Sequence, residues 1–312
     1  MTDTFNHIKL FSFNREFNFL KKLYTNNKLP NKILFSGYKS SGKSTFVYHF
    51  INYIFSIKEE FKYDSKKMKI NVNNKSFKLV SSLTHPNFYK ISLSENKNFI
   101  EILQIRETLH YLKKTSFLDL PKIVLIDDCE CLNKSSSNSL LKVLEEPPEN
   151  TFFFLVHNSQ KAILDTIKSR CIQINLFMNK LSRKELISYL TDNKYENINF
   201  DFKNDYLKPK FYVDYINYCE RNNLSLEDTD IKNLFNNIFK NQDYKKDIFI
   251  KKYFFLLVQL FFYNNLINNI NKDNSNHELF LYFVKRFNDI KKYNLDFESF
   301  VIEFKNKAFD EK

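Results

Sequence analysis

The residues with the clearest chemistry form one octet, Gly37-Tyr38-Lys39-Ser40-Ser41-Gly42-Lys43-Ser44. It satisfies the pattern G-x-x-x-x-G-K-[ST] of a phosphate loop, in which successive backbone N–H groups point at phosphate oxygens. Gly37 and Gly42 are the only two glycines in the chain, and glycine persists where a backbone needs φ > 0 or a very close approach. The octet therefore predicts a site for nucleotide phosphates, with ATP and Mg²⁺ as the ligands it would take.

Each residue of the loop has an expected part in that site. Lys43 would reach the β- and γ-phosphates, and Ser44 would ligate Mg²⁺. Further nucleotide contacts are expected from the rest of the loop and the residue that follows it, namely Gly37, Lys39, Ser40, Ser41, Gly42 and Thr45. Two alternatives stay open: a chance match to the pattern, and a loop that keeps its fold but no longer holds nucleotide.

A pair of acidic residues ends the apolar run Ile123–Ile126. Asp127 suits the acid that holds Mg²⁺ in phosphate-loop proteins, the alternative being an ordinary strand-end Asp. Hydrolysis also needs a carboxylate that activates water, and Asp128 is one methylene shorter than the Glu that many such enzymes carry there. Because a displacement of about 1 Å can cost on the order of a hundredfold in rate, we expect Asp128 to be an impaired base. We expect Glu130 to point elsewhere, so this chain alone would hydrolyse ATP weakly or not at all.

The elements that must position these residues follow from the hydrophobic pattern, which predicts a parallel α/β sheet in the first half of the chain. The apolar runs expected as strands are Ile33–Phe35, Phe88–Leu93, Ile123–Ile126, Phe152–Val156 and Ile172–Leu176. Helical spacing is found over residues 46–55, 102–112, 135–144 (with Ser135 to Ser137 as N-caps) and 160–168. Residues 57–82 are weakly patterned and predict a mobile or hairpin-like insertion. The phosphate loop thus has a strand before it and a helix after it, the context that phosphate binding requires.

Two longer motifs follow the acidic pair: Asn138-Ser139-Leu140-Leu141-Lys142-Val143-Leu144-Glu145-Glu146-Pro147-Pro148, and then Ser169-Arg170-Cys171. Together with Leu29–Leu34 and Thr84–Asn87, they make residues 8–178 resemble the bacterial clamp-loader branch of the AAA+ family. The resemblance implies an AAA+ phosphate-loop domain with a parallel sheet over residues 1–178. A small helical lid over residues 179–225 and an all-α collar for oligomerisation over residues 226–312 would follow.

Within that branch the chain resembles the delta-prime type of DNA polymerase III subunit more than the tau/gamma motors. The motors carry a four-cysteine zinc module, whereas residues 45–120 contain no cysteine, so no zinc is expected. The motors also carry Asp-Glu where this chain has Asp127-Asp128. They use Gly-x-x-Arg in the lid as a second sensor, but the corresponding region, Lys208–Phe211, has neither the glycine nor the arginine. The resemblance therefore implies a subunit that is not itself a motor.

The same resemblance assigns two more residues. Arg170 would be an arginine finger that reaches into the neighbouring subunit's nucleotide site, where such a cation can be worth about 10³–10⁵ in rate. Asn158 takes the sensor-1 position, which detects the γ-phosphate, and His157 beside it is expected only to pack. The alternatives are a salt-bridged surface arginine at a helix end and a strand-terminating asparagine.

The function implied is that of a non-motor clamp-loader subunit. It would assemble with tau/gamma-type motors and delta, supply Arg170 in trans, and aid ATP-dependent loading of the sliding clamp onto primed DNA during replication. Two alternatives remain. One is an active clamp-loader ATPase of the tau/gamma type that uses its own Lys43, Ser44, Asp127 and Asp128. The other is a phosphate-loop DNA-processing ATPase outside replication.

The bulk composition is compatible with this function. The chain has 312 residues of which 43% are hydrophobic, which excludes global disorder. Its net charge of +12 fits an anionic partner such as nucleic acid, or else the codon usage of an AT-rich genome. The four cysteines, Cys129, Cys131, Cys171 and Cys219, lack metal-ligand spacing and are expected as reduced thiols. No signal peptide is recognisable and the run Tyr253–Tyr263 is too short for a bilayer, so we expect a cytoplasmic protein without a membrane partner.

Overall fold

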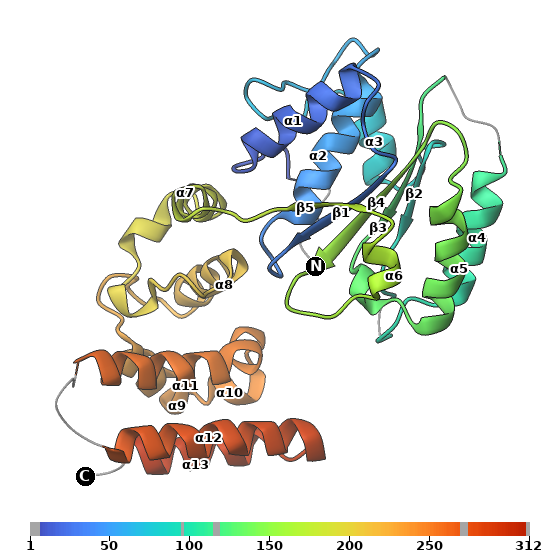
Figure 1. Ribbon diagram of the computed structural model, residues 1–312. Helices are drawn as coiled ribbons and strands as arrows, with labels where there is room; N and C mark the ends of the chain where they lie inside the picture. The colour runs from blue at the N-terminus through green and yellow to red at the C-terminus, as the bar shows by residue number, and fades with distance from the viewer. Residues whose placement is uncertain (1–6, 95–96, 115–118, 269–273, 310–312) are drawn as a thin grey trace. The chain divides into compact units, whose positions relative to one another are not determined.

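The computed structural model describes residues 7–94, 97–114, 119–268 and 274–309. The chain divides into two compact units, Met1–Arg183 (unit 1) and Lys184–Lys312 (unit 2). Unit 1 is an α/β domain, and the described residues of unit 2 form helices and turns without a strand (Figure 1). The predicted fold class, a parallel-sheet phosphate-loop domain followed by helical structure, is confirmed. The division of the helical part at residue 225 stays a prediction.

Unit 1 is built on a five-stranded parallel sheet with the order β2-β3-β4-β1-β5. Its strands are β1 (Lys32–Gly37), β2 (Phe88–Ile91), β3 (Lys122–Ile126), β4 (Thr151–Asn158) and β5 (Ile172–Asn175). All five runs expected as strands are therefore confirmed. Because β1 lies between β4 and β5, Gly37 at the end of β1 pairs with Asn158 at the end of β4. The carboxyl ends of parallel strands are where ligands bind in open α/β sheets.

Helices cover both faces of this sheet. The helices α1 (Asn14–Thr25), α2 (Lys43–Ser56) and α3 (Lys75–Ser81) lie on one face, and α4 (Ile102–Leu112), α5 (Lys134–Glu145) and α6 (Asp165–Lys168) lie on the other (Figure 1). Side chains alternate along a strand, so Ile123 and Leu125 pack toward α1 and α2, whereas Val124 and Ile126 pack toward α4 and α5. Burial on both faces explains why the central strands are continuous apolar runs.

Three local expectations need correction. Residues 57–82 are not only a hairpin-like insertion, because α3 forms in them once the Asn74 side chain accepts a hydrogen bond from the Phe77 N–H at 2.6 Å. The N-cap of α5 is Asn133, which accepts from the Ser136 N–H at 2.8 Å, and not one of the serines after it. The helix expected over residues 160–168 is confined to α6.

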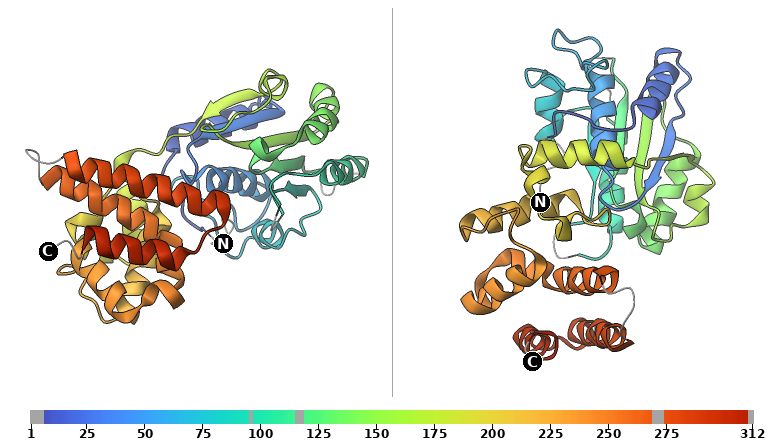
Figure 2. Two further views of the ribbon diagram at one scale, coloured as in Figure 1. Left: turned by 90° about the horizontal axis from the view of Figure 1, so that it is seen from below. Right: turned by 90° about the vertical axis from the view of Figure 1, so that its left-hand side faces the viewer.

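Unit 2 contains α7 (Lys180–Leu190, which begins in unit 1), α8 (Pro209–Arg221), α9 (Ile231–Asn241), α10 (Asp243–Lys246), α11 (Ile248–Asn268), α12 (Asn274–Tyr293) and α13 (Phe297–Ala308), with short 3₁₀ turns at Lys194–Asn197 and Phe200–Phe202. The helix α11 packs against α12, and α12 against α13 (Figure 2). None of the described helices is both long enough and apolar enough to cross a membrane.

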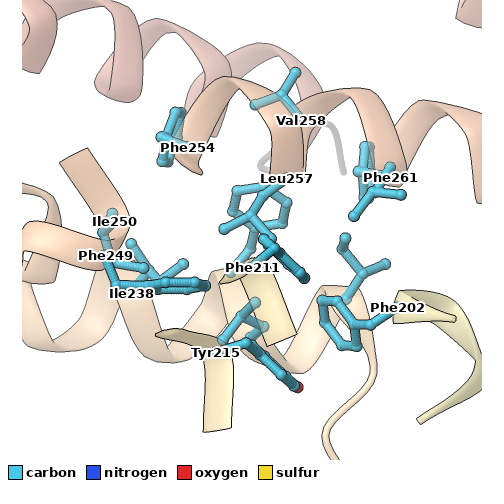
Figure 3. Close-up of a cluster of buried hydrophobic side chains, with 14 of the residues drawn as sticks. Phe202, Phe211, Tyr215, Ile238, Phe249, Ile250, Phe254, Leu257, Val258 and Phe261 are labelled. Carbon is cyan, nitrogen blue, oxygen red and sulfur yellow. The ribbon is translucent and has the colours of Figure 1, made fainter. Parts of the chain in front are cut away.

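The aromatic residues of unit 2 form its interior. Phe211 and Tyr215 of α8 pack on Phe249 of α11, and Tyr215 also meets Phe202 (Figure 3). All four side chains are buried in one hydrophobic cluster that extends from Ile187 to Phe304. Most of the aromatic face of α11 is therefore core within this unit, which is the usual role of such a face.

Candidate functional site

The phosphate loop joins the carboxyl end of β1 to the first turn of α2 (Figure 1). A Cβ at position 37 would lie 2.3 Å from the backbone oxygen of Leu176, so only glycine fits beside the end of β5. Gly42 has φ +84°, a left-handed conformation that favours glycine. The two glycines of the chain are thus kept for two separate steric reasons, and both preserve the shape of this loop.

Ser44 links the loop to the neighbouring strand end. Its hydroxyl donates a hydrogen bond to Oδ1 of Asp127 at 2.9 Å. Burial and the nearby Asp128 carboxylate raise the pKa of Asp127, while the Lys90 ammonium and the Ser44 hydrogen bond act in the opposite direction. The two residues expected to hold Mg²⁺ therefore lie together, although they are far apart in the sequence.

Lys43 is buried at the base of the loop and bonds to it. Its ammonium donates to the backbone oxygen of Tyr38 at 2.6 Å. Burial lowers the pKa of Lys43, whereas the carboxylates of Glu130, Asp127 and Asp128 act to raise it. Because an ammonium has three N–H donors, this bond does not exclude a phosphate oxygen as a second acceptor.

The remaining loop residues differ in their surroundings. Lys39 and Ser40 are exposed, and Thr45 is half-buried at the start of α2. The Ser41 hydroxyl oxygen is buried and has no hydrogen-bond partner among the described residues. Because a buried polar atom without a partner costs free energy, this hydroxyl fits a loop that binds a phosphate oxygen or water.

Asp128 and Glu130 follow β3, and only Glu130 lies differently from its expectation. Asp128 is exposed and has a left-handed backbone (φ 54°), and it precedes a 3₁₀ turn at Cys129–Cys131. Glu130 does not point elsewhere: its Oε2 accepts from the backbone N–H of Asn158 at 3.1 Å, and its charge acts on Lys43. Glu130 lies inside this 3₁₀ turn, and the turn keeps it next to the ends of β3 and β4. The expectation for Glu130 was wrong because the sequence shows no signal for this turn.

Asn158 and His157 end β4 beside the phosphate loop. The Asn158 side-chain oxygen accepts from the Gln160 N–H at 3.2 Å. The His157 ring is buried, with Nδ1 3.0 Å from the Ser36 hydroxyl and Nε2 3.0 Å from the Lys161 backbone oxygen. His157 therefore packs, as expected, and Asn158 lies at the strand end where the sensor-1 position was predicted.

Arg170 follows α6 and is held by a salt bridge. Its Nε and Nη2 donate to the same oxygen of Glu145, Oε1, at 3.1 and 2.5 Å, and its Nη1 donates to the backbone oxygen of Thr166 at 2.9 Å. The Arg170 side chain keeps 32% of its surface exposed. The two long sequence motifs therefore meet at this pair. Within this chain Arg170 has the geometry of a salt-bridged arginine at a helix end.

The described residues contain no group of three or more His, Cys, Asp or Glu side chains that could hold a metal ion. The four cysteines are free and buried. Magnesium takes much of its octahedral shell from water and phosphate oxygens, so the Ser44 and Asp127 oxygens are a donor set compatible with Mg²⁺ only when a phosphate is also present.

Known proteins resemble this chain across its α/β unit. A family model described as DNA polymerase III, delta subunit, matches residues 14–180, more than half of the chain. The DNA polymerase III subunit delta' of Pseudomonas aeruginosa is 34% identical over 99 residues (32% of this chain and 30% of that protein). The Escherichia coli subunit delta' is 36% identical over 93 residues (30% and 28%). That of Buchnera aphidicola subsp. Schizaphis graminum is 28% identical over 177 residues (57% and 52%).

The matched segments span between 28% and 52% of the lengths of these relatives. A DNA polymerase III subunit gamma, from Buchnera aphidicola subsp. Schizaphis graminum, is also similar, at 33% identity over 174 residues (55% of this chain and 46% of that protein). The family match extends from α1 to the beginning of α7. Because the family model covers more than half of the chain, the chain belongs to the DNA polymerase III delta-subunit family.

Proposed function

We propose that this chain acts as a non-motor subunit of a DNA polymerase III clamp loader. It would assemble in the cytoplasm with tau/gamma-type motors and a delta subunit into a ring that loads the sliding clamp onto primed DNA. The observation that carries the proposal is the family match over residues 14–180, which contains the phosphate loop, the acidic pair and the motif with Arg170. Its four buried free thiols are compatible with a reducing compartment.

The loop supports nucleotide binding by this chain. Three observations fit a phosphate cradle: the two sterically required glycines, the Ser44–Asp127 hydrogen bond, and the buried Ser41 hydroxyl, which has no partner in the described part of the chain. Backbone N–H groups and Lys43 would hold the phosphates, Ser44 and Asp127 the Mg²⁺, and Asn158 would respond to the γ-phosphate. When bound, ATP with Mg²⁺ supplies the charge that these groups are arranged to meet.

The acidic groups support weak hydrolysis by this chain. Asp128 is exposed, and its left-handed backbone turns it out of the strand direction. Glu130 acts on the charge of Lys43, but one of its carboxylate oxygens already accepts a hydrogen bond from the Asn158 N–H. In the proposed function Arg170 therefore serves the nucleotide of a neighbouring motor. The proximity of Glu130 to Lys43 is the observation that favours the alternative, an active ATPase.

A basic groove between α4 and α5 supports a DNA partner. It has a volume of about 570 Å³, and the charged or titratable side chains that line it are Arg106, His110, Lys113, Lys142 and Glu146. Cations of this kind position a protein on phosphates without reading sequence. Their convergence from two helices distinguishes them from lysines that are spread singly over the surface.

Reversing the charge of Lys142 in this groove (Lys142→Glu) should weaken binding of primed DNA by the assembled loader and make the salt dependence shallower. Each phosphate contact contributes a slope of about −0.9 in log K against log[salt]. The slope should therefore become less negative by the amount that corresponds to about one to two lost contacts. Fluorescence anisotropy with labelled primed DNA at several salt concentrations measures it. Lys78→Glu, on the exposed side of α3, makes the same charge change and should leave both quantities unchanged. Equal effects of the two variants would show that the groove does not contact DNA.

The proposed function is tested by assembly. The purified full chain, mixed with the motor-type and delta-type subunits of the same genome, should elute with them in size-exclusion chromatography as one complex of defined stoichiometry. The complex should load the sliding clamp onto primed DNA only when this chain is present. Failure of the chain to associate with either subunit would refute the proposal and favour a phosphate-loop protein outside replication.

A further inference from the structure

The salt bridge between Arg170 and Glu145 engages a particular edge of the guanidinium. Nε and Nη2, which form one side of the planar fork, both donate to Oε1 of Glu145, and Nη1 donates to the Thr166 carbonyl. A guanidinium has five N–H donors in a fixed plane. Three are used in these contacts, which leaves one N–H on Nη1 and one on Nη2. Two donors on the terminal nitrogens match the two-oxygen contact that arginine makes with phosphate.

The two partners hold Arg170 from different elements. Glu145 is the last residue of α5, whereas Thr166 lies in α6, one helical turn before Arg170. Ile167 in α6 and Leu144 in α5 are both fully buried in the same hydrophobic cluster, so the backbone that carries both partners is anchored. A long side chain that is bonded both to a carboxylate and to a backbone carbonyl loses much of its rotamer freedom before it meets a ligand.

We propose that Glu145 is a positioning residue for Arg170. Its carboxylate would hold the side edge of the guanidinium and so aim the two remaining N–H groups at the phosphate oxygens of a nucleotide in the neighbouring subunit. The inference rests on the proposed function, because it takes that neighbour's nucleotide as the ligand of Arg170. It also gives a physical reason for the two motifs to occur together: one carries the guanidinium and the other carries the carboxylate that orients it.

Glu145 could also slow the neighbour's reaction, which is the opposite of what a positioning role predicts. A carboxylate on the guanidinium also offsets part of its positive charge and could hold the arginine away from a phosphate. Glu145 keeps 53% of its side-chain surface exposed, so water screens its charge strongly, whereas the direction of its hydrogen bonds is retained. Positioning should therefore outweigh charge neutralisation, and removing the carboxylate should slow the neighbour's reaction.

The test uses the full chain in the reconstituted loader, saturated with primed DNA and sliding clamp, and measures steady-state ATP hydrolysis. Glu145→Gln should lower kcat by about ten- to a hundredfold, the range expected when a reacting group is misplaced by up to 1 Å, with KM for ATP and ring assembly unchanged. Glu149→Gln removes the same charge from another exposed position and should leave kcat unchanged. On an Arg170→Ala background, Glu145→Gln should cause no further loss, because the two residues act as a unit.

The outcomes separate this inference from the function on which it rests. A large loss with Arg170→Ala together with full activity of Glu145→Gln would overturn the positioning role and leave the arginine finger intact. A higher kcat for Glu145→Gln would show that the carboxylate restrains Arg170, and would likewise overturn it. No loss with Arg170→Ala would refute both. The thermal midpoint of each variant, compared with that of the unmodified chain, identifies a loss of kcat that follows from unfolding.

Discussion

Replacing Arg170 by alanine should lower DNA-stimulated ATP hydrolysis by the reconstituted loader by about 10³- to 10⁵-fold, the range known for arginine fingers supplied in trans. The physical reason is that a planar cation close to the γ-phosphate stabilises negative charge that develops in the transition state. The Arg170 side chain is partly exposed and is held by surface contacts, so its loss should cost the fold little. The ring should therefore still assemble, which size-exclusion chromatography of the complex would verify.

Two further variants sharpen that result. Arg170→Lys keeps the charge but loses the planar fork that bonds to Glu145 and to phosphate together, so it should recover only a small part of the activity. Arg15→Ala removes an exposed arginine from α1 and should leave the rate unchanged. Unchanged hydrolysis by the Arg170→Ala complex would exclude the arginine-finger role and leave a surface salt bridge as the whole function of this residue.

Replacing Lys43 by alanine should weaken binding of ATP with Mg²⁺ to the isolated chain by about 10- to 100-fold, because a hydrogen bond to a charged group contributes about 1.5–3 kcal/mol. Lys43 is buried beside the carboxylates of Glu130, Asp127 and Asp128, so its loss also leaves those negative charges close to the phosphates without a cation. The Kd can be measured by titration with a fluorescent ATP analogue in the presence of Mg²⁺. Lys58→Ala, at an exposed position just beyond α2, is the matched control.

Comparing ATP turnover by the unmodified chain and by the Lys43→Ala variant shows whether this chain only binds ATP or also hydrolyses it. If the isolated chain binds ATP but shows no turnover above background, the proposal that its loop binds nucleotide without hydrolysing it is supported. Turnover that Lys43→Ala abolishes would instead establish an active ATPase and would direct attention to Glu130 as its base. Equal affinity of the Lys43→Ala variant and the unmodified chain would mean that the loop keeps its shape without holding nucleotide.

Much of unit 1 follows from local patterns. All five strands coincide with short apolar runs, because a strand covered on both faces must be apolar at nearly every position. The loop was recognised from two glycines and a lysine at fixed spacing, and its context was confirmed. The N-cap of α5 and the helix within residues 57–82 were missed because each depends on whether one asparagine side chain, Asn133 or Asn74, bonds to a backbone N–H. Several residues nearby could have done so equally well.

The sequence by itself determined which side chains are the candidates for the chemistry, since Lys43, Ser44, Asp127 and Arg170 each belong to a motif with its own spacing. Only the tertiary structure decided how they are partnered. Placing β1 between β4 and β5 sets Gly37 against Leu176 and beside Asn158, and the turn after β3 returns Glu130 to that strand end. The packing of α5 and α6 on the same sheet face joins Arg170 to Glu145. These contacts join residues distant in the sequence, so their geometry depends on strand order and helix packing, which no local pattern contains.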